Sequence, residues 1–204
     1  MPASTKGNHR MTAPYIVGIG GTTRANSSTE KALQVALAAA REQGARTTAF
    51  LGEELATLPM YAPEDPERTE LAKRFVDELR AADGIIIAAP AYHGTLSGLV
   101  KNALDYTQDM MADARVYFDG RSVGCIASGA GWQGVVATLT TLRQIVHSLR
   151  GWPTPLGAGI NSLEKPFDAE GNPANDKVKF QLETVGREVV QFANAMAALR
   201  STDA

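Results

Sequence analysis

The stretch "YIVGIGGTTRANSSTEKALQVALAAAREQG", residues 15–44, joins an apolar run to a helical pattern through a loop of small and hydroxyl-bearing residues. The run "YIVGIG" is short and continuously apolar, as expected of a buried strand. From residue 28 onward the apolar side chains recur with helical spacing, and Gly44 provides a helix end. The segment therefore predicts a strand, a loop and a helix, a pattern that the rest of the chain repeats.

The loop in this unit, residues 21–27, is suited to a phosphate group. A loop that leads into a helix presents unpaired backbone N–H groups and the positive end of the helix dipole. Arg24 adds a cation with a forked set of donors. Hydroxyl groups stand at Thr22, Thr23, Ser27, Ser28 and Thr29. In the alternative interpretation, Ser27 and Glu30 form a capping box and the loop only starts the helix.

Two common nucleotide-binding signatures do not fit this loop. A triphosphate loop needs a lysine followed by Ser or Thr after a spaced pair of glycines. The dinucleotide fingerprint needs a third glycine, and Thr23 stands at that position although Gly18 and Gly20 fit the first two. The residues that are present favour a phosphomonoester bound by hydroxyls and one arginine, without a metal ion.

Strand and helix patterns alternate through the rest of the chain. Further strands are predicted at residues 46–51, 84–90 and 122–128 and near 154–160, and further helices at 68–82, 98–113, 135–151 and 180–200. This alternation predicts an α/β fold, a flavodoxin-like, five-stranded parallel sheet of order 2-1-3-4-5 with helices on both faces. Ligands of such sheets bind outside the carboxyl ends of the strands, at the point where the strand order reverses. The loops after the first, third and fourth strands are therefore the candidate site.

Two of these loops remain to be described. "PAYHGTLSG", residues 90–98, is a proline-stiffened turn that could lay backbone N–H groups against a flat ligand, with Tyr92 and His93 at its edge. Otherwise it is a helix-entry loop with an incidental Tyr-His pair. "SGAGWQG", residues 128–134, contains three glycines, which allow close approach of the backbone to a ligand. Trp132 in it is either a lid over the ligand or an anchor of an interface, and a flexible turn is the alternative.

The composition limits the classes of function. The 204 residues suffice for one domain, and a net charge of −2 with scattered Lys and Arg excludes a nucleic-acid footprint. No stretch approaches the roughly 18 apolar residues of a membrane span. Residues 1–12 are polar, lack a signal-peptide core and predict a disordered tail ahead of one domain, residues 13–204. The one cysteine, Cys125, is expected to be buried, which suits a cytoplasmic protein, and the His and Cys residues lack metal-ligand spacing.

The three loops together resemble the NAD(P)H-dependent FMN reductases of the flavodoxin-like fold. The first motif of that family, G-S-x-R-x-x-S, falls on Gly21, Thr22, Arg24 and Ser27, with threonine in place of serine. Its second motif, P-E-Y-N-x-S, falls on Pro90, Ala91, Tyr92, His93 and Thr95, with Ala91 replacing the glutamate and His93 the asparagine. The following L-K-N-A-x-D helix pattern is matched by Lys101, Asn102, Ala103 and Asp105. The resemblance runs from about residue 15 to the last helix.

This resemblance implies FMN at the carboxyl edge of the sheet, reduced by NADPH or NADH. The implied phosphate ligands are Thr22, Arg24, Ser27, Ser28 and Thr29. The implied contacts of the ring are Pro90, Ala91, Tyr92, His93, Gly94 and Thr95, with Ser128, Gly129 and Gly131 from the third loop. Hydride transfer belongs to the flavin and the nicotinamide, so no catalytic residue is assigned to the protein.

Three functions stay open at this point. The first is reduction of FMN, with a flavin-dependent monooxygenase as a candidate partner. The second is an FMN-retaining reductase of quinones, azo compounds or metal ions. The third, a non-catalytic flavodoxin-type electron carrier, is disfavoured by the nearly balanced charge. Two helices carry apolar residues beyond a single stripe, which predicts a homodimer or homotetramer; these residues are Met110, Met111, Val135, Val136, Leu139, Leu142 and Ile145.

Overall fold

The computed structural model describes residues 13–202, and the predicted tail at residues 1–12 lies outside them. The strands are β1 (Tyr15–Gly20), β2 (Arg46–Leu51), β3 (Gly84–Tyr92), β4 (Thr95–Leu96), β5 (Ser122–Gly129), β6 (Trp152–Pro153) and β7 (Ala158–Asn161). The α-helices are α1 (Ser28–Glu42), α2 (Gly52–Leu55), α3 (Glu70–Ala81), α4 (Gly98–Asp105), α5 (Trp132–Ser148) and α6 (Asp176–Thr202). Two 3-10 helices, η1 (Tyr106–Met110) and η2 (Ser162–Glu164), complete the fold.

The sheet has the predicted order but more strands than predicted. Its path is β2-β1-β3-β5-β6, with every pairing on that path parallel, which confirms the α/β, flavodoxin-like order 2-1-3-4-5. The count of five is wrong, because seven strands form. β4 pairs with the end of β3 as an antiparallel hairpin. The last strand, predicted near residues 154–160, forms only from Ala158 onward, as β7, and β6 lies ahead of the predicted range. Both pair with β5, and Pro155 lies in the gap between them.

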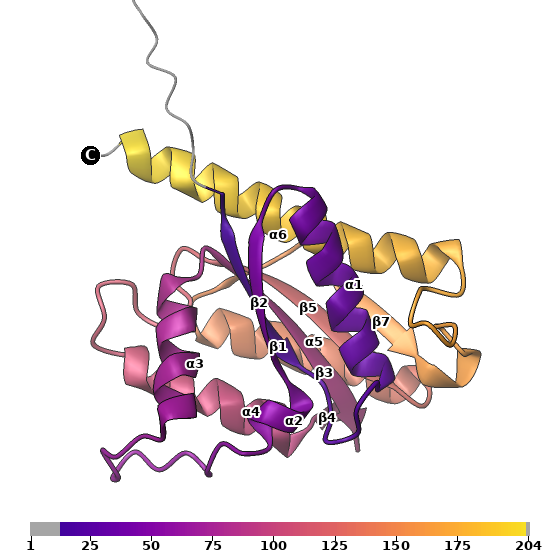
Figure 1. The fold of residues 1–204 in the computed structure, drawn as a ribbon, viewed down its shortest axis with the longest axis horizontal. Helices are drawn as coiled ribbons and strands as arrows, with labels where there is room; N and C mark the ends of the chain where they lie inside the picture. Colours follow the sequence, from indigo (N-terminus) through magenta and orange to yellow (C-terminus); the bar gives the residue numbers. More distant parts are fainter. Residues whose placement is uncertain (1–12, 203–204) are drawn as a thin grey trace, which may run out of the picture.

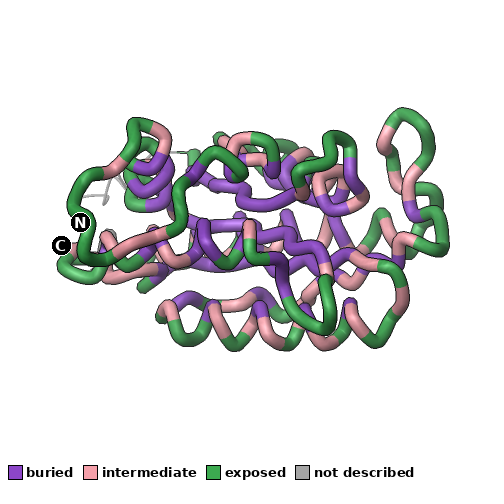
Figure 2. Tube along the Cα trace, turned by 90° about the horizontal axis from the view of Figure 1, so that it is seen from below, coloured by how far each residue is buried: buried purple, intermediate pink, exposed green. Residues whose placement is uncertain are grey.

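Helices cover both faces of the sheet, as Figures 1 and 2 show. On β1, Tyr15, Val17 and Ile19 point into one core, which α3, α4 and α5 complete. Ile16 points into the second core, under α1 and α6. Strands buried on both faces are continuously apolar, and this is why the sequence pattern identified them. Among residues 13–202, no helix combines the length and the apolar character that crossing a bilayer requires.

Several element boundaries differ from the prediction. β3 continues past Pro90, because β1 pairs with it only as far as Ala88 and proline is tolerated where a strand becomes an edge. The helix predicted over residues 98–113 is α-helical only to Asp105 and then narrows to η1, where Thr107 donates its hydroxyl to the Leu104 carbonyl. α6 begins earlier than predicted, because Asn175 accepts a hydrogen bond from the Val178 N–H and caps it.

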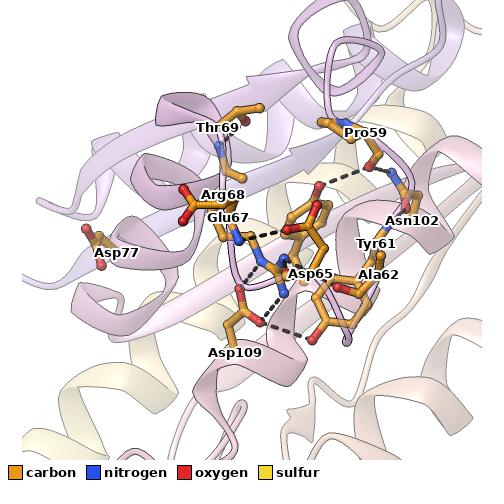
Figure 3. A network of polar contacts seen from close by, with 12 residues as sticks. Pro59, Tyr61, Ala62, Asp65, Glu67, Arg68, Thr69, Asp77, Asn102 and Asp109 are labelled. Carbon is orange, nitrogen blue, oxygen red and sulfur yellow. Dashed lines mark hydrogen bonds and ion pairs between the residues drawn. The ribbon is translucent and has the colours of Figure 1, made fainter.

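The proline-rich segment before α3 is tied to α4 and η1 by a polar network (Figure 3). The Asn102 amide donates to the Pro59 carbonyl at 2.8 Å, and its oxygen accepts from the Tyr61 N–H at 2.8 Å. Arg68 makes a bidentate pair with Asp109, at 2.7 and 3.0 Å, and Tyr61 donates its hydroxyl to the same carboxylate. The Arg68 guanidinium holds the pKa of Asp109 below its usual range. Asn102, the asparagine of the L-K-N-A-x-D pattern, therefore has a structural role, which is to attach the proline-rich segment to α4.

Candidate functional site

A cavity of about 480 Å³ opens at the carboxyl edge of the sheet. This volume lies in the range of small-molecule sites. The loop after β1 contributes Thr22, Thr23 and Arg24 to its lining, and the start of α1 contributes Ser27, Ser28 and Thr29. The end of β3 contributes Pro90, Ala91 and Tyr92, the end of β5 contributes Ser128, Gly129 and Ala130, and η2 contributes Ser162. The three loops singled out in the sequence thus meet at one cavity.

Two glycines set the position of the first loop. Gly20 lies so close to β3 that a Cβ on it would stand 2.1 Å from the Ala88 carbonyl oxygen. Gly52, just after β2, leaves only 2.0 Å between a Cβ and the Thr22 carbonyl oxygen. Because neither position has room for a side chain, the loop is seated against β3 on one side and the end of β2 on the other.

Within this loop the hydroxyl groups have defined roles. The Arg24 N–H donates to Thr22 Oγ1 at 3.1 Å, which closes a small turn before α1. Ser27 Oγ accepts from the Glu30 N–H at 3.2 Å and caps α1, as the helix-start interpretation predicted. Capping uses the acceptor side of the hydroxyl, so its proton is free to be donated into the cavity. Ser27 and Thr29 are buried although they line the cavity.

The second loop is a β-hairpin and not only an entry to a helix. Tyr92 pairs with Thr95 across a two-residue turn, His93-Gly94, in which both residues have positive φ, 51° and 85°. Such turns match the natural twist of paired strands. The helix starts separately at Ser97, whose Oγ accepts from the Val100 N–H. His93, Gly94 and Thr95 form the exposed tip and do not line the cavity.

The third loop is hydrogen-bonded to the strand beside it. The Gly131 N–H donates to Asn161 Oδ1 at 3.0 Å, and the Trp132 indole N–H donates to Glu164 Oε1 at 2.7 Å. Trp132 opens α5 and lines a smaller hollow next to Asn161, not the large cavity. Gly131 is thus held by a hydrogen bond, and Trp132 does not line the cavity as a lid would.

The sequence-predicted site residues divide into two groups. Those that line the cavity are Thr22, Arg24, Ser27, Ser28, Thr29, Pro90, Ala91, Tyr92, Ser128 and Gly129. Those outside its lining are His93, Gly94, Thr95 and Gly131. The lining also includes Ala130 and Ser162, which the prediction did not assign, and Thr23, whose hydroxyl was counted in the phosphate loop but not assigned as a ligand. The signal for Ser162 is its place directly after the last strand, because that strand ends at the same edge of the sheet.

The charges around the cavity are few. Arg24 is the one Lys or Arg among the described residues that line it. Cys125 is buried in the sheet, where desolvation raises the pKa of its thiol to about 12, so it stays protonated. Within residues 13–202, no three His, Cys, Asp or Glu side chains gather in a way that would ligate a metal ion.

Comparisons with known proteins identify the class. The model of the NADPH-dependent FMN reductase family matches residues 14–162. An NAD(P)H-dependent FMN reductase of Pseudomonas aeruginosa is 29% identical over 166 residues, covering 80% of this chain and 86% of the relative. An FMN-dependent NADPH-azoreductase of Staphylococcus aureus is 30% identical over 136 residues, covering 65% of this chain and 68% of the relative.

A solved structure shares the fold at lower identity. FerB, an NAD(P)H:(acceptor) oxidoreductase of Paracoccus denitrificans, superimposes with a TM-score of 0.71 at 18% identity, over 90% of this chain and 99% of the other. The family match covers most of the chain. The protein therefore belongs to the NADPH-dependent FMN reductase family and is an oxidoreductase that uses FMN and NAD(P)H.

Proposed function

We propose that the cavity at the carboxyl edge binds FMN, with its phosphate in the loop after β1. The observation that carries the proposal is the convergence of Arg24 and several hydroxyl groups at the start of α1. The residues fit a phosphomonoester, because the Arg24 guanidinium, the hydroxyls of Ser27 and Ser28 and the helix N–H groups are donors, whereas the Thr22 hydroxyl donates to the Arg24 carbonyl at 3.1 Å. Pro90–Tyr92 and residues 128–130 would then flank the flavin ring.

When bound, FMN supplies the hydride acceptor, and NAD(P)H is the donor. The residues of this chain would bind and orient the flavin. Apart from Tyr92, the two strand ends that line the cavity present small side chains, which would let a flat ring lie close to their backbone. Tyr92, which is half exposed at the rim, would pack beside the ring.

The reaction we propose is reduction of exchangeable FMN by NAD(P)H. A single lining cation supports it. Each tenfold in affinity requires about 1.4 kcal/mol, and among residues 13–202 no second arginine or lysine lines the cavity to add to the affinity for the phosphate. Reduced flavin released from the site could serve a flavin-dependent monooxygenase. A second candidate is an enzyme that retains FMN and reduces quinones or azo compounds. The hydrogen bond that fixes Gly131 favours this second candidate, because it immobilises one wall of the cavity.

Purification without added flavin separates the two candidates. We expect a colourless protein whose NADPH oxidation saturates with micromolar FMN, as exchange requires. A yellow protein that keeps its flavin through dialysis and reduces quinones without added FMN would replace the first candidate by the second. Absence of NAD(P)H oxidation with FMN and with every acceptor would contradict both and favour an electron carrier.

Arg24→Ala is expected to weaken FMN binding by about 1.5–3 kcal/mol, the usual contribution of a charge-assisted hydrogen bond. Flavin fluorescence titration measures the dissociation constant. Arg41→Ala is the matched control, since Arg41 lies in the last turn of α1, at the end remote from the loop that holds Arg24, and donates to Thr47 Oγ1. Equal dissociation constants for wild type and Arg24→Ala would show that the phosphate of FMN does not bind in this loop.

We also propose that the protein assembles into a homodimer or homotetramer. Of the apolar residues behind this prediction, Met110, Val135 and Leu142 are buried in the core and give no support. Met111 and Val136 are more than half exposed and remain available for an interface. Light scattering is expected to give a mass of at least twice the 21.7 kDa of one chain.

The buried free thiol of Cys125 supports a reducing compartment, for which we propose the cytoplasm.

A further inference from the structure

Asn161 lies between two turns that both line the cavity. The β5–α5 loop contributes Gly129 and Ala130 to the lining, and η2 contributes Ser162. Asn161 is 9% exposed, and its Oδ1 accepts from the Gly131 N–H at 3.0 Å and from the Leu163 N–H at 3.2 Å. One carboxamide oxygen therefore joins the two turns.

The other end of this carboxamide is fixed by a carboxylate. Asn161 Nδ2 donates to Glu164 Oε1 at 3.0 Å, and the Trp132 indole N–H donates to the same oxygen at 2.7 Å. Lys177 stacks its ammonium over the Trp132 ring, 5.3 Å from the ring centroid. The bond to Glu164 sets the orientation of the amide, because it requires the NH2 group to face the carboxylate and the oxygen to face Gly131.

The loop has few other means of holding its shape. Gly131 takes a φ of 102° and stands at the N-cap of α5, where it has no side chain to accept from the first helical N–H groups. Gly129 is seated against Ala91, since a Cβ on it would lie 2.8 Å from the Ala91 Cβ. The backbone of the β5–α5 loop is thus held in place by Ala91 on one side and by Asn161 on the other.

We propose that Asn161, oriented by Glu164, is a positioning residue that sets the β5–α5 loop against the flavin. The inference rests on the proposed FMN site. A shift of the Gly131 peptide moves Gly129 and Ala130 and so changes the width of the cavity. The carboxamide is needed because the position calls for an acceptor toward two N–H groups and a donor toward a carboxylate, which no other uncharged group of this size supplies.

The test exchanges the amide and the acid. Asn161→Asp keeps the acceptor for Gly131 but places two carboxylates against each other, and it is expected to weaken FMN binding about tenfold or more. Adding Glu164→Gln to that variant removes the repulsion between the two carboxylates and supplies an amide donor toward position 161. Because one oxygen, Glu164 Oε1, accepts from both Asn161 and the Trp132 indole, an amide that turns its NH2 group toward position 161 gives up the bond to the indole. The double variant is expected to recover the wild-type dissociation constant to within about threefold.

Asn172→Asp is the matched control, because Asn172 also donates its amide to a carboxylate, Asp168 Oδ2 at 3.2 Å, but does not line this cavity. Its FMN affinity is expected to equal that of wild type. NMR of the flavin-free proteins provides the second readout. The Gly131 amide resonance is expected to shift in Asn161→Asp and to return in the double variant, which a merely destabilising substitution would not do.

If Asn161→Asp fails to fold, Trp132→Phe gives the test in a milder form, since it removes one hydrogen bond from Glu164 and adds no charge. It is expected to weaken FMN binding about threefold. Unchanged FMN affinity in Asn161→Asp, or in Trp132→Phe where the former does not fold, would overturn the positioning role, as would a folded double variant without recovery. Wild-type protein that binds no FMN would instead overturn the proposed function itself.

Discussion

Replacing Gly20 with alanine is expected to destabilise the protein by roughly 3 kcal/mol or more and to prevent tight FMN binding. The added Cβ would meet the Ala88 carbonyl oxygen at 2.1 Å, and because the backbone fixes the positions of both atoms, no change of rotamer relieves the overlap. Room can be made only by moving β1 away from β3. That movement separates the proposed phosphate loop from the strand end that would flank the ring.

Gly44→Ala is the control for this substitution. Gly44 also has a positive φ, 84°, but a Cβ on it would meet nothing within 4 Å. Its cost is therefore the left-handed conformation alone, about 1–2 kcal/mol. Urea unfolding and FMN titration of both variants measure the difference. Similar losses in the two variants would show that backbone conformation matters at Gly20 and that close approach to β3 does not.

Replacing Arg121 with methionine is expected to lower the free energy of unfolding by about 3 kcal/mol. Arg121 is 1% exposed and donates to the carbonyls of Arg80 and Ala82, at the end of α3, and to that of Tyr117. Carbonyls at a helix end have no partner within the helix, so methionine would leave them buried and unsatisfied. Urea unfolding measures the loss. In Arg187→Met, where a half-exposed ion pair with Glu183 is removed, the change is expected to stay below about 1 kcal/mol.

The same arginine gives a pH dependence. Burial, and then the nearby Arg115, lower the pKa of Arg121 to about 10, below its usual value of 12.5. The unfolded chain therefore binds more protons between these two values, and the contribution of Arg121 to stability rises with pH in that window. At neutral pH the Arg121 guanidinium is charged in both the folded and the unfolded state. Its hydrogen bonds to the carbonyls then offset a desolvation cost that does not change with pH.

The fold was largely predictable from the sequence, and for a physical reason. Parallel strands buried on both faces must be continuously apolar, and the crossover helices between them carry their own period. The failures occur where tertiary contacts decide. Pro90 could sit inside β3 only because β1 had already ended, and the gap at Pro155 could not be told from a continuous edge strand.

The candidate site was predictable as far as local chemistry determines it. Arg24 and the hydroxyls after β1 stand in a recognisable loop, and the structure brings them to the cavity. Asn161 and Glu164 gave no such signal, because their partners, Gly131 and Trp132, are about 30 residues away and polar residues after a strand are common. Contacts between loops form only in the assembled sheet, so they cannot be inferred from local patterns in the sequence.

The close contact between the backbone of Thr22 and Gly52 links ligand binding to β2, an edge strand of the sheet. Among the described strands, β2 pairs on one side only, with β1, and edge strands open at a smaller free energy than central ones. When β2 opens, the backbone of the loop after β1 loses one of its two supports, so the binding-competent fraction falls. By mass action a ligand in that loop must then suppress the opening, and amide exchange along β2 would slow on binding although no β2 side chain lines the cavity.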